Sequence, residues 1–375
     1  MIAKDIPSLP MGDSPDLILV PATPSERIAS IKLNSIAWKG PLDIDTYIER
    51  ENHLLEQRLT CDGLTCWILV DRTEPEGTRT ILSSCESYRK KALLAHDGKV
   101  DDVGTHGIGI PGKGYAKRML EELSTKLDTW KMEKEARGRA LFTILFSDIG
   151  KKFYAQFGWR PFVSSHLALP AAEGGGAGKT RELYAKDVES NVCNEVVLAK
   201  LRDQLQAASR KSTGAKVAIV PDYDHFVWHW AREEFFAEKK CSHRSPPVIK
   251  GAGNDDARVY CVWNRNFGEE PEDNVLYILR WVYDEPTTPE EEQKLVQAMA
   301  GILKRAQQEA HEWNLNTVEF WNPTPLLQKA VGVLDPDAQL VHREKSSISS
   351  LRWTGAEYGL GKDVEWFLNE KYTWC

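Results

Sequence analysis

The spacing of hydrophobic positions in the first 170 residues alternates between a strand period of two and a helix period near 3.6. This alternation predicts a mixed α/β unit. Expected strands cover residues 17–20, 65–71, 78–93, 103–110, 141–146 and 162–169, and expected helices cover 25–37, 45–59, 116–130 and 151–157. The strand at 103–110 is expected to be short, because only four residues separate His106 from Pro111.

A glycine-rich stretch at residues 171–180 interrupts this pattern and is typical of a flexible linker. Beyond it, helices are expected at 187–209, 228–236, 289–313 and from 325, and strands at 217–220, 259–263, 275–283, 317–321 and 340–353. The order of these elements echoes the first half, which indicates a weak internal duplication of about 150 residues. We therefore expect domains at 1–170 and 181–375, joined by the linker at 171–180.

The amino-acid composition limits the classes of protein to which this chain can belong. The chain has 375 residues, 42% hydrophobic and 27% charged, with a net charge of −7, and it can form two cores. The acidic balance argues against a nucleic-acid or anionic-membrane partner, and no signal or membrane-spanning stretch is visible. Seven cysteines without regular spacing are typical of reduced thiols in a cytoplasmic protein, and we expect no metal site.

The most informative segment is residues 107–116, Gly-Ile-Gly-Ile-Pro-Gly-Lys-Gly-Tyr-Ala, which opens an amphipathic helix. Its four glycines leave backbone N–H groups bare at a helix N-terminus, as pyrophosphate sites require. A nucleotide-triphosphate loop fits up to Lys113, but Gly114 stands where a magnesium-binding hydroxyl is needed. A dinucleotide fingerprint fits the glycines at 107, 109 and 112, but no acidic residue ends a strand about 20 residues later.

A third interpretation uses a second motif. Residues 111–116 resemble the acetyl-coenzyme A loop of the GCN5-related N-acetyltransferase (GNAT) superfamily, [Gln/Arg]-x-x-Gly-x-[Gly/Ala], although Pro111 replaces the usual basic residue. Residues 147–159 resemble the Asn-x6-Tyr-x3-Gly-Phe segment of that superfamily, with Ser147 for Asn and Trp159 for Phe. Segments 228–235, 258–263 and 278–280 are similar to fungal lysine N6-acetyltransferases of lysine catabolism. The resemblance implies a GNAT fold at the N-terminus and a dedicated C-terminal domain. Because the order of elements is repeated, we expect this second domain to be a degenerate GNAT-like repeat.

The resemblance also implies the cofactor site. The strand backbone usually pairs with the pantetheine arm, and the loop grips the pyrophosphate. The residues expected to bind acetyl-CoA are Ile108, Gly109, Ile110, Gly112, Lys113, Gly114, Tyr115, Ala116 and Ser147. Tyr154 matches the motif tyrosine and is the candidate general acid for the departing thiolate, since a phenol with a pKa near 10 suits a proton donor.

Acetyl transfer to an amine needs further groups. A lysine ammonium has a pKa near 10.4, so roughly one molecule in a thousand is neutral at pH 7.4. A base or a desolvating site must make up this deficit. The candidate bases are Glu86, Asp102 and His106, of which we favour His106 because it is nearest the loop.

The helix at 228–236 offers charged residues for a free amino acid. His229, Arg232 and Glu233 lie at positions i, i+3 and i+4 and share one helix face. They are expected to bind the carboxylate and ammonium groups of the substrate, or else to form a salt-bridge face between domains. We expect an acetyl-CoA-dependent N-acetyltransferase of a small amine, L-lysine at N6. The alternatives are another amine, such as a polyamine or xenobiotic, and a non-catalytic acyl-CoA sensor or scaffold.

Overall fold

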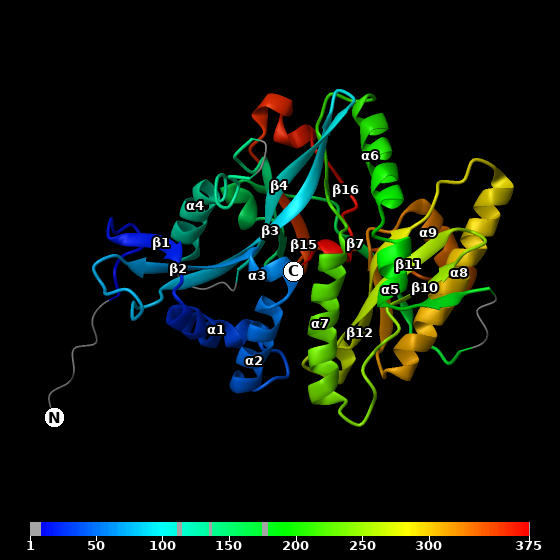
Figure 1. The fold of residues 1–375 in the computed structure, drawn as a ribbon, viewed down its shortest axis with the longest axis horizontal. Helices are drawn as coiled ribbons and strands as arrows, with labels where there is room; N and C mark the ends of the chain where they lie inside the picture. The colour runs from blue at the N-terminus through cyan, green and yellow to red at the C-terminus, as the bar shows by residue number, and fades with distance from the viewer. Residues whose placement is uncertain (1–8, 111–114, 135–136, 175–178, 375) are drawn as a thin grey trace.

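Two mixed β-sheets and the helices around them form the molecule, as Figure 1 shows. The computed structural model describes residues 9–110, 115–134, 137–174 and 179–374. Within this part of the chain the first sheet has the strand order β1-β2-β3-β4-β5-β15-β6, and β9 and β16 extend it beside β3. Its strands are β1 (Leu17–Pro21), β2 (Leu64–Asp71), β3 (Ser83–His96), β4 (Lys99–Gly109), β5 (Phe142–Ser147), β6 (Trp159–Pro161), β9 (Lys216–Ile219), β15 (Ile348–Trp353) and β16 (Glu365–Phe367).

The second sheet has the order β14-β7-β13-β12-β11-β10-β8. Strands β12 and β13 pair in parallel, and the other neighbours pair antiparallel. Its strands are β7 (Ser165–Pro170), β8 (Arg181–Leu183), β10 (Gly251–Asn254), β11 (Val259–Asn266), β12 (Val275–Val282), β13 (Thr317–Trp321) and β14 (Val341–His342). Both sheets mix parallel and antiparallel pairs, which confirms the α/β expectation.

Local signals in the sequence begin several helices. The α-helices are α1 (Pro24–Trp38), α2 (Ile44–Leu55), α3 (Arg58–Cys61), α4 (Ala116–Lys126), α5 (Ala185–Asn191), α6 (Glu195–Ser209), α7 (Tyr223–Lys240), α8 (Pro289–Glu312) and α9 (Pro325–Leu334). A Thr-Pro pair starts α1, α8 and α9, where the threonine hydroxyl caps the helix and proline suits its first position. Among the described residues, none of the helices combines the length and apolarity needed to cross a bilayer.

The start of α8 differs from the glycine loop that precedes α4. Thr288 accepts a hydrogen bond from the N–H of Glu291, and the Glu291 carboxylate accepts from the N–H and hydroxyl of Thr287. Three glutamates occupy the first turn. Side chains of the protein therefore already accept hydrogen bonds from N–H groups at this helix end. They also place negative charge there, which disfavours a bound phosphate.

The two sheets exchange strands. Strand β7, from the first 170 residues, lies between β13 and β14 of the second sheet. Strand β15, from the C-terminal part, lies between β5 and β6 of the first sheet. The strand expected at 340–353 is therefore two strands, β14 and β15, in different sheets. The domain boundary at 171–180 stays a prediction, and it does not coincide with the division between the sheets.

Two further expectations about secondary structure differ from the structure. Strand β4 covers 11 residues and pairs with β3 from Lys99 to Gly109, so the prediction of a short strand before the loop was wrong. Most of its first residues are polar, so the hydrophobic pattern did not indicate that the strand begins there. The helix expected at 187–209 is two helices, because Asn194 caps α6 with its side chain after a break.

Helix α7 lies at the centre of the molecule, between the helices of the first half and the second sheet (Figure 1). It packs against α2, α3, β11 and the short 3-10 helix η5 (Lys371–Thr373). Ten of its residues are buried, which is why the sequence from Trp228 to Phe236 is so rich in aromatic side chains. Because α7 packs against elements of both halves, its polar residues His225, His229 and Glu233 are buried, whereas Glu234 and the last turn of the helix are exposed.

Candidate active site

The parallel pairing of β4 and β5 stops before either strand ends. The paired positions are His106 with Thr143, Gly107 with Ile144, and Ile108 with Leu145. Beyond this point β4 remains paired with β3, and β5 remains paired with β15. The two strands thus diverge at their carboxyl ends, and the backbone groups that face this opening can bind a ligand in extended form.

A cavity of about 400 Å³ lies at this opening. Its lining comes from β3, β4, β5 and the 3-10 helix η1 (Tyr154–Phe157), together with α2, α7 and the residues after β11. Apolar and aromatic side chains form much of the lining. Its charged residues are Arg50, Glu51, Glu86, Asp148, Arg232 and Glu269. A recess that combines apolar and aromatic surface with a few charged groups is typical of a small-molecule site.

Glu86 on β3 has the properties of a general base. Its side chain is 7% exposed, lines the cavity and accepts a 2.6 Å hydrogen bond from the hydroxyl of Tyr88. Burial, together with the negative charge of Glu51, raises the pKa of Glu86 to about 7. The carboxylate is then basic enough to take a proton near neutral pH and is half ionised there.

Tyr154 lines the same cavity from η1. Gly158 ends this turn in the left-handed conformation (φ 93°), which glycine adopts without strain and which fixes the Gly-Trp part of the motif. Burial raises the pKa of Tyr154 to about 12, so the phenol keeps its proton at neutral pH. The cavity therefore brings a carboxylate that can accept a proton together with a phenol that can donate one.

The other two candidate bases lie away from the cavity. His106 is fully buried, its Nε2 lies 2.9 Å from the carbonyl oxygen of Trp130, and burial lowers its pKa to about 4. Asp102 is exposed and forms an ion pair with Arg202 at 2.5 Å. The structure therefore favours Glu86 over His106 as the candidate base. Glu86 pairs directly with Gly109 at the end of β4 and lines the cavity, whereas His106 does not line it.

The residues expected to bind acetyl-CoA fall into three groups. Ile108, Gly109 and Ile110 line the cavity, whereas Gly112, Lys113 and Gly114 lie outside the described residues. Ala116 is the first residue of α4, and the hydroxyl of Tyr115 donates to the carbonyl of Pro10 at 2.6 Å. The hydroxyl of Ser147 donates to the carbonyl of Gly150 at 2.7 Å, within the turn that leads to η1, and lies outside the cavity lining.

Arg232 is the residue of the α7 triplet that lines the cavity. Its Nη1 donates to Oδ1 of Asn266 at 2.8 Å, and its guanidinium lies 5.0 Å from the ring centre of Phe236. Burial, with the nearby charge of Arg50, lowers the pKa of Arg232. His229 is buried instead against the C-terminal segment, where its Nε2 lies 3.3 Å from the carbonyl oxygen of Tyr372.

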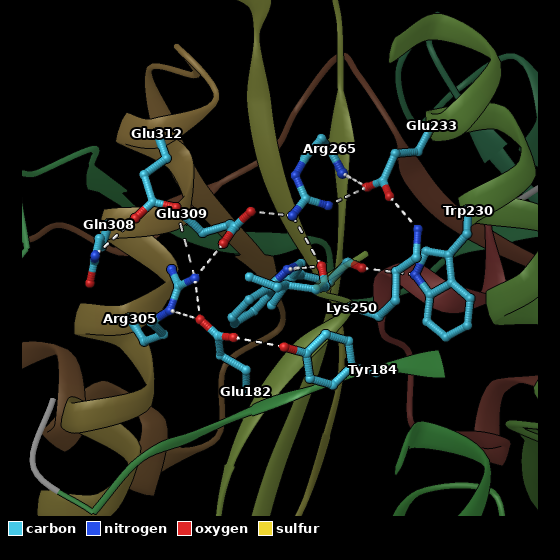
Figure 2. Close-up of polar contacts among 12 residues, drawn as sticks. Glu182, Tyr184, Trp230, Glu233, Lys250, Arg265, Arg305, Gln308, Glu309 and Glu312 are labelled. Atoms are coloured by element: carbon cyan, nitrogen blue, oxygen red, sulfur yellow. Dashed lines mark hydrogen bonds and ion pairs between the residues drawn. The ribbon is translucent and has the colours of Figure 1, made fainter. Parts of the chain in front are cut away.

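Glu233 belongs to a buried ion network rather than to the cavity, as Figure 2 shows. Its carboxylate contacts Nζ of Lys250 at 2.8 Å and Nη1 of Arg265 at 3.1 Å. Arg265 also pairs with Glu309 of α8, which continues to Arg305 at 2.7 Å. Arg232 therefore lines the cavity, whereas Glu233 joins an ion network whose members all lie in residues 181–375, so its contacts do not form the expected salt-bridge face between domains.

Several cavity residues were not identified from the sequence. They are Arg50, Glu51, Asp148, Asn266, Glu269 and Trp374. No motif marks Arg50 and Glu51, which lie in an ordinary amphipathic helix, and Trp374 reaches the cavity from the end of the chain. Asp148 differs from the other residues of this set, because it lies within the second motif, directly after Ser147.

Comparison with known proteins identifies the family. The family described as the LYC1 GNAT-like C-terminal domain matches residues 166–375. A lysine acetyltransferase of Yarrowia lipolytica is 24% identical, over 94% of this chain and 98% of its own. An uncharacterized protein of Saccharomyces cerevisiae is 22% identical, over 91% of this chain and 93% of its own.

Solved structures align at lower similarity. A GCN5-related N-acetyltransferase from Kribbella flavida has a TM-score of 0.48 and 15% identity, over 90% of this chain and 71% of that one. An N-myristoyltransferase of Saccharomyces cerevisiae with bound myristoyl-CoA has a TM-score of 0.49 and 11% identity, over 93% and 81%. The family match spans more than half of the chain, and the chain therefore belongs to the LYC1-like GNAT family of N-acetyltransferases.

Proposed function

We propose that this enzyme transfers the acetyl group of acetyl-CoA to the side-chain amine of L-lysine. The observation that carries the proposal is that Glu86, Tyr154 and Arg232 line one cavity. The name of the Yarrowia lipolytica relative, a lysine acetyltransferase, supports the acceptor.

The opening between β4 and β5 fits an acyl-CoA thioester. Beyond Ile108 the edge of β4 that faces β5 has no strand partner among the described residues, and Gly109 and Ile110 line the cavity there. Unpaired backbone groups at a strand edge can hydrogen-bond an extended amide-bearing chain such as pantetheine. Acetyl-CoA supplies the activated acetyl group when it is bound.

Glu86 and Tyr154 then divide the proton transfers. Glu86 takes a proton from the acceptor ammonium, whose pKa near 10.4 leaves it charged in water. The apolar lining helps, because desolvation lowers the pKa of a bound ammonium. Tyr154 donates its phenolic proton to the leaving sulfur, a role that its high pKa makes compatible with neutral pH.

Other residues of the lining suit the amino-acid end and the methylene chain of lysine. Arg232 provides a guanidinium for the carboxylate, and the exposed Glu269 at the cavity rim provides a carboxylate for the α-ammonium. Trp38, Leu54 and Phe236 supply apolar surface for the methylene chain between the two ends.

Turnover assays test the proposal directly. Release of free CoA is measured with L-lysine, spermidine and an unrelated aromatic amine, and mass spectrometry with NMR locates the acetyl group on the product. The proposal expects N6-acetyl-L-lysine and the highest kcat/KM for L-lysine. A preference for spermidine would refute the acceptor, and acetyl-CoA binding without turnover of any amine would favour a sensor or scaffold.

A further inference from the structure

Arg50 of α2 has hydrogen-bonding capacity that the protein leaves unused. The residue lines the cavity and is 4% exposed. Its Nε and Nη2 donate to Glu51 at 2.9 and 2.5 Å, and Nη2 also donates to the carbonyl of Trp38 at 3.2 Å. Its buried Nη1 has no acceptor among the described residues. A buried guanidinium N–H without an acceptor costs free energy, and a ligand can remove that cost.

Arg50 and Arg232 lie against the same aromatic ring. The guanidinium carbon of Arg50 is 5.4 Å from the ring centre of Phe236, and that of Arg232 is 5.0 Å from it. Arg232 contacts an amide oxygen, that of Asn266, and pairs with no carboxylate in the described part of the chain. We call Arg50, Arg232 and Phe236 the two-arginine corner.

The charges of this corner match one monovalent anion. Arg50 and Arg232 each carry one positive charge, and Glu51 compensates one of them. Glu86, Asp148 and Glu269 line the rest of the cavity, so a polyanion such as a pyrophosphate would be repelled. A single carboxylate attached to a cationic molecule fits both conditions, and the low pKa of Arg232 is consistent with a site that an anion stabilises.

We propose that Arg50 and Arg232 together bind the α-carboxylate of the substrate, so that the enzyme selects an amino acid over a diamine of the same length. The carboxylate bridges Nη1 of Arg50 and the guanidinium of Arg232. Glu51 holds Arg50 in place, and Asn266 holds Arg232, so both donors are oriented before the substrate binds. This inference rests on the proposed function and adds the specificity-determining residue Arg50.

Cadaverine provides the decisive comparison, because it is L-lysine without the carboxylate. Steady-state kinetics are measured with both amines for the wild type, R50M, R232M and the double variant. R50M is expected to lower kcat/KM for L-lysine about 30-fold, mainly through KM, and to change that for cadaverine by less than about threefold. Two arginines that bind one carboxylate act together, so the double variant should lose less than the product of the single losses.

Further variants separate binding from folding. R305M is the matched control, because Arg305 is a buried arginine of the ion network outside the cavity, and it should leave the ratio of the two substrates unchanged. R50K keeps the charge and should recover part of the L-lysine affinity. L-norleucine has the same carboxylate but no side-chain amine, and R50M should raise its inhibition constant at least about tenfold.

The outcomes distinguish this inference from the proposed function. If the wild type acetylates L-lysine and R50M leaves both the substrate ratio and L-norleucine inhibition unchanged, Arg50 does not bind the carboxylate although the proposed function holds. Equal loss with L-lysine and cadaverine in R50M would overturn the inference in favour of a structural role. If the wild type does not acetylate L-lysine, the proposed function itself fails.

Discussion

Replacing Glu86 by glutamine should abolish most activity and at the same time stabilise the protein. Glutamine keeps the size of the side chain and an oxygen that accepts the hydrogen bond from Tyr88. It removes the ionisable group that burial disfavours in its charged form. The same substitution therefore separates the cost of burying this group from its use in catalysis.

The magnitude follows from the pKa. Folding raises the pKa of Glu86 from an ordinary 4.5 to about 7, which corresponds to about 3 kcal/mol at ~1.36 kcal/mol per pH unit. Below pH 4.5 the group is protonated in both the folded and the unfolded state, and it costs nothing. The cost grows between pH 4.5 and 7 and is complete above pH 7. The free energy of unfolding of E86Q should therefore exceed that of the wild type by about 3 kcal/mol at pH 8, which corresponds to about 4 °C in Tm. At pH 4 the two proteins should show no such difference.

The assays are thermal unfolding of both proteins at pH 4, 6 and 8 and kinetics over the same range. For the wild type, kcat/KM should rise about tenfold per pH unit below pH 7 and then level off as Glu86 becomes ionised. E86Q should lose about 10²–10⁴-fold in kcat and show no change of slope near pH 7. Activity of E86Q within threefold of the wild type, or a Tm gain that does not grow with pH, would refute the reasoning.

Three further substitutions test other parts of the structure. Y154F should lower kcat about 10–100-fold and leave the affinity for acetyl-CoA, measured by calorimetry, within about twofold; an unchanged kcat would exclude Tyr154 as the acid. D102N removes an exposed ion pair away from the cavity and should change kcat/KM by less than about twofold and stability by under ~1 kcal/mol. R265M leaves Glu233 buried without its guanidinium partner and should cost about 3–5 kcal/mol in denaturant unfolding. R181A, which breaks an exposed pair, should cost under ~1 kcal/mol and is the control.

Features with local causes could be predicted from the sequence. Helices α1, α8 and α9 begin at Thr-Pro pairs whose caps act within a few residues, so the sequence alone places their starts. The exchange of β7 and β15 between the sheets could not be predicted in this way. Hydrophobic periodicity shows that a strand is buried, but the partner strand comes from a distant part of the chain.

The same distinction applies to the cavity. Tyr154 was found because a motif fixes its distance from the glycine loop, and Arg232 because the composition of α7 is unusual. Glu86 was a candidate, yet only the register of β3 against β4 shows that it reaches the end of the strand. Arg50 was missed, because its significance depends on the ring of Phe236 and the charge of Arg232, 182 or more residues away in the sequence.

The two halves of the chain contribute different residues to the cavity. Glu86 and Tyr154 come from the first half, whereas Arg232 and Asn266 come from the second. Strand β15 of the C-terminal part pairs with β5 up to Ser147, so it also supports the strand end that carries Asp148 into the cavity. The cavity thus combines residues of both halves: the proposed acid and base, Tyr154 and Glu86, come from the first half, and the two arginines proposed to bind the carboxylate come one from each half.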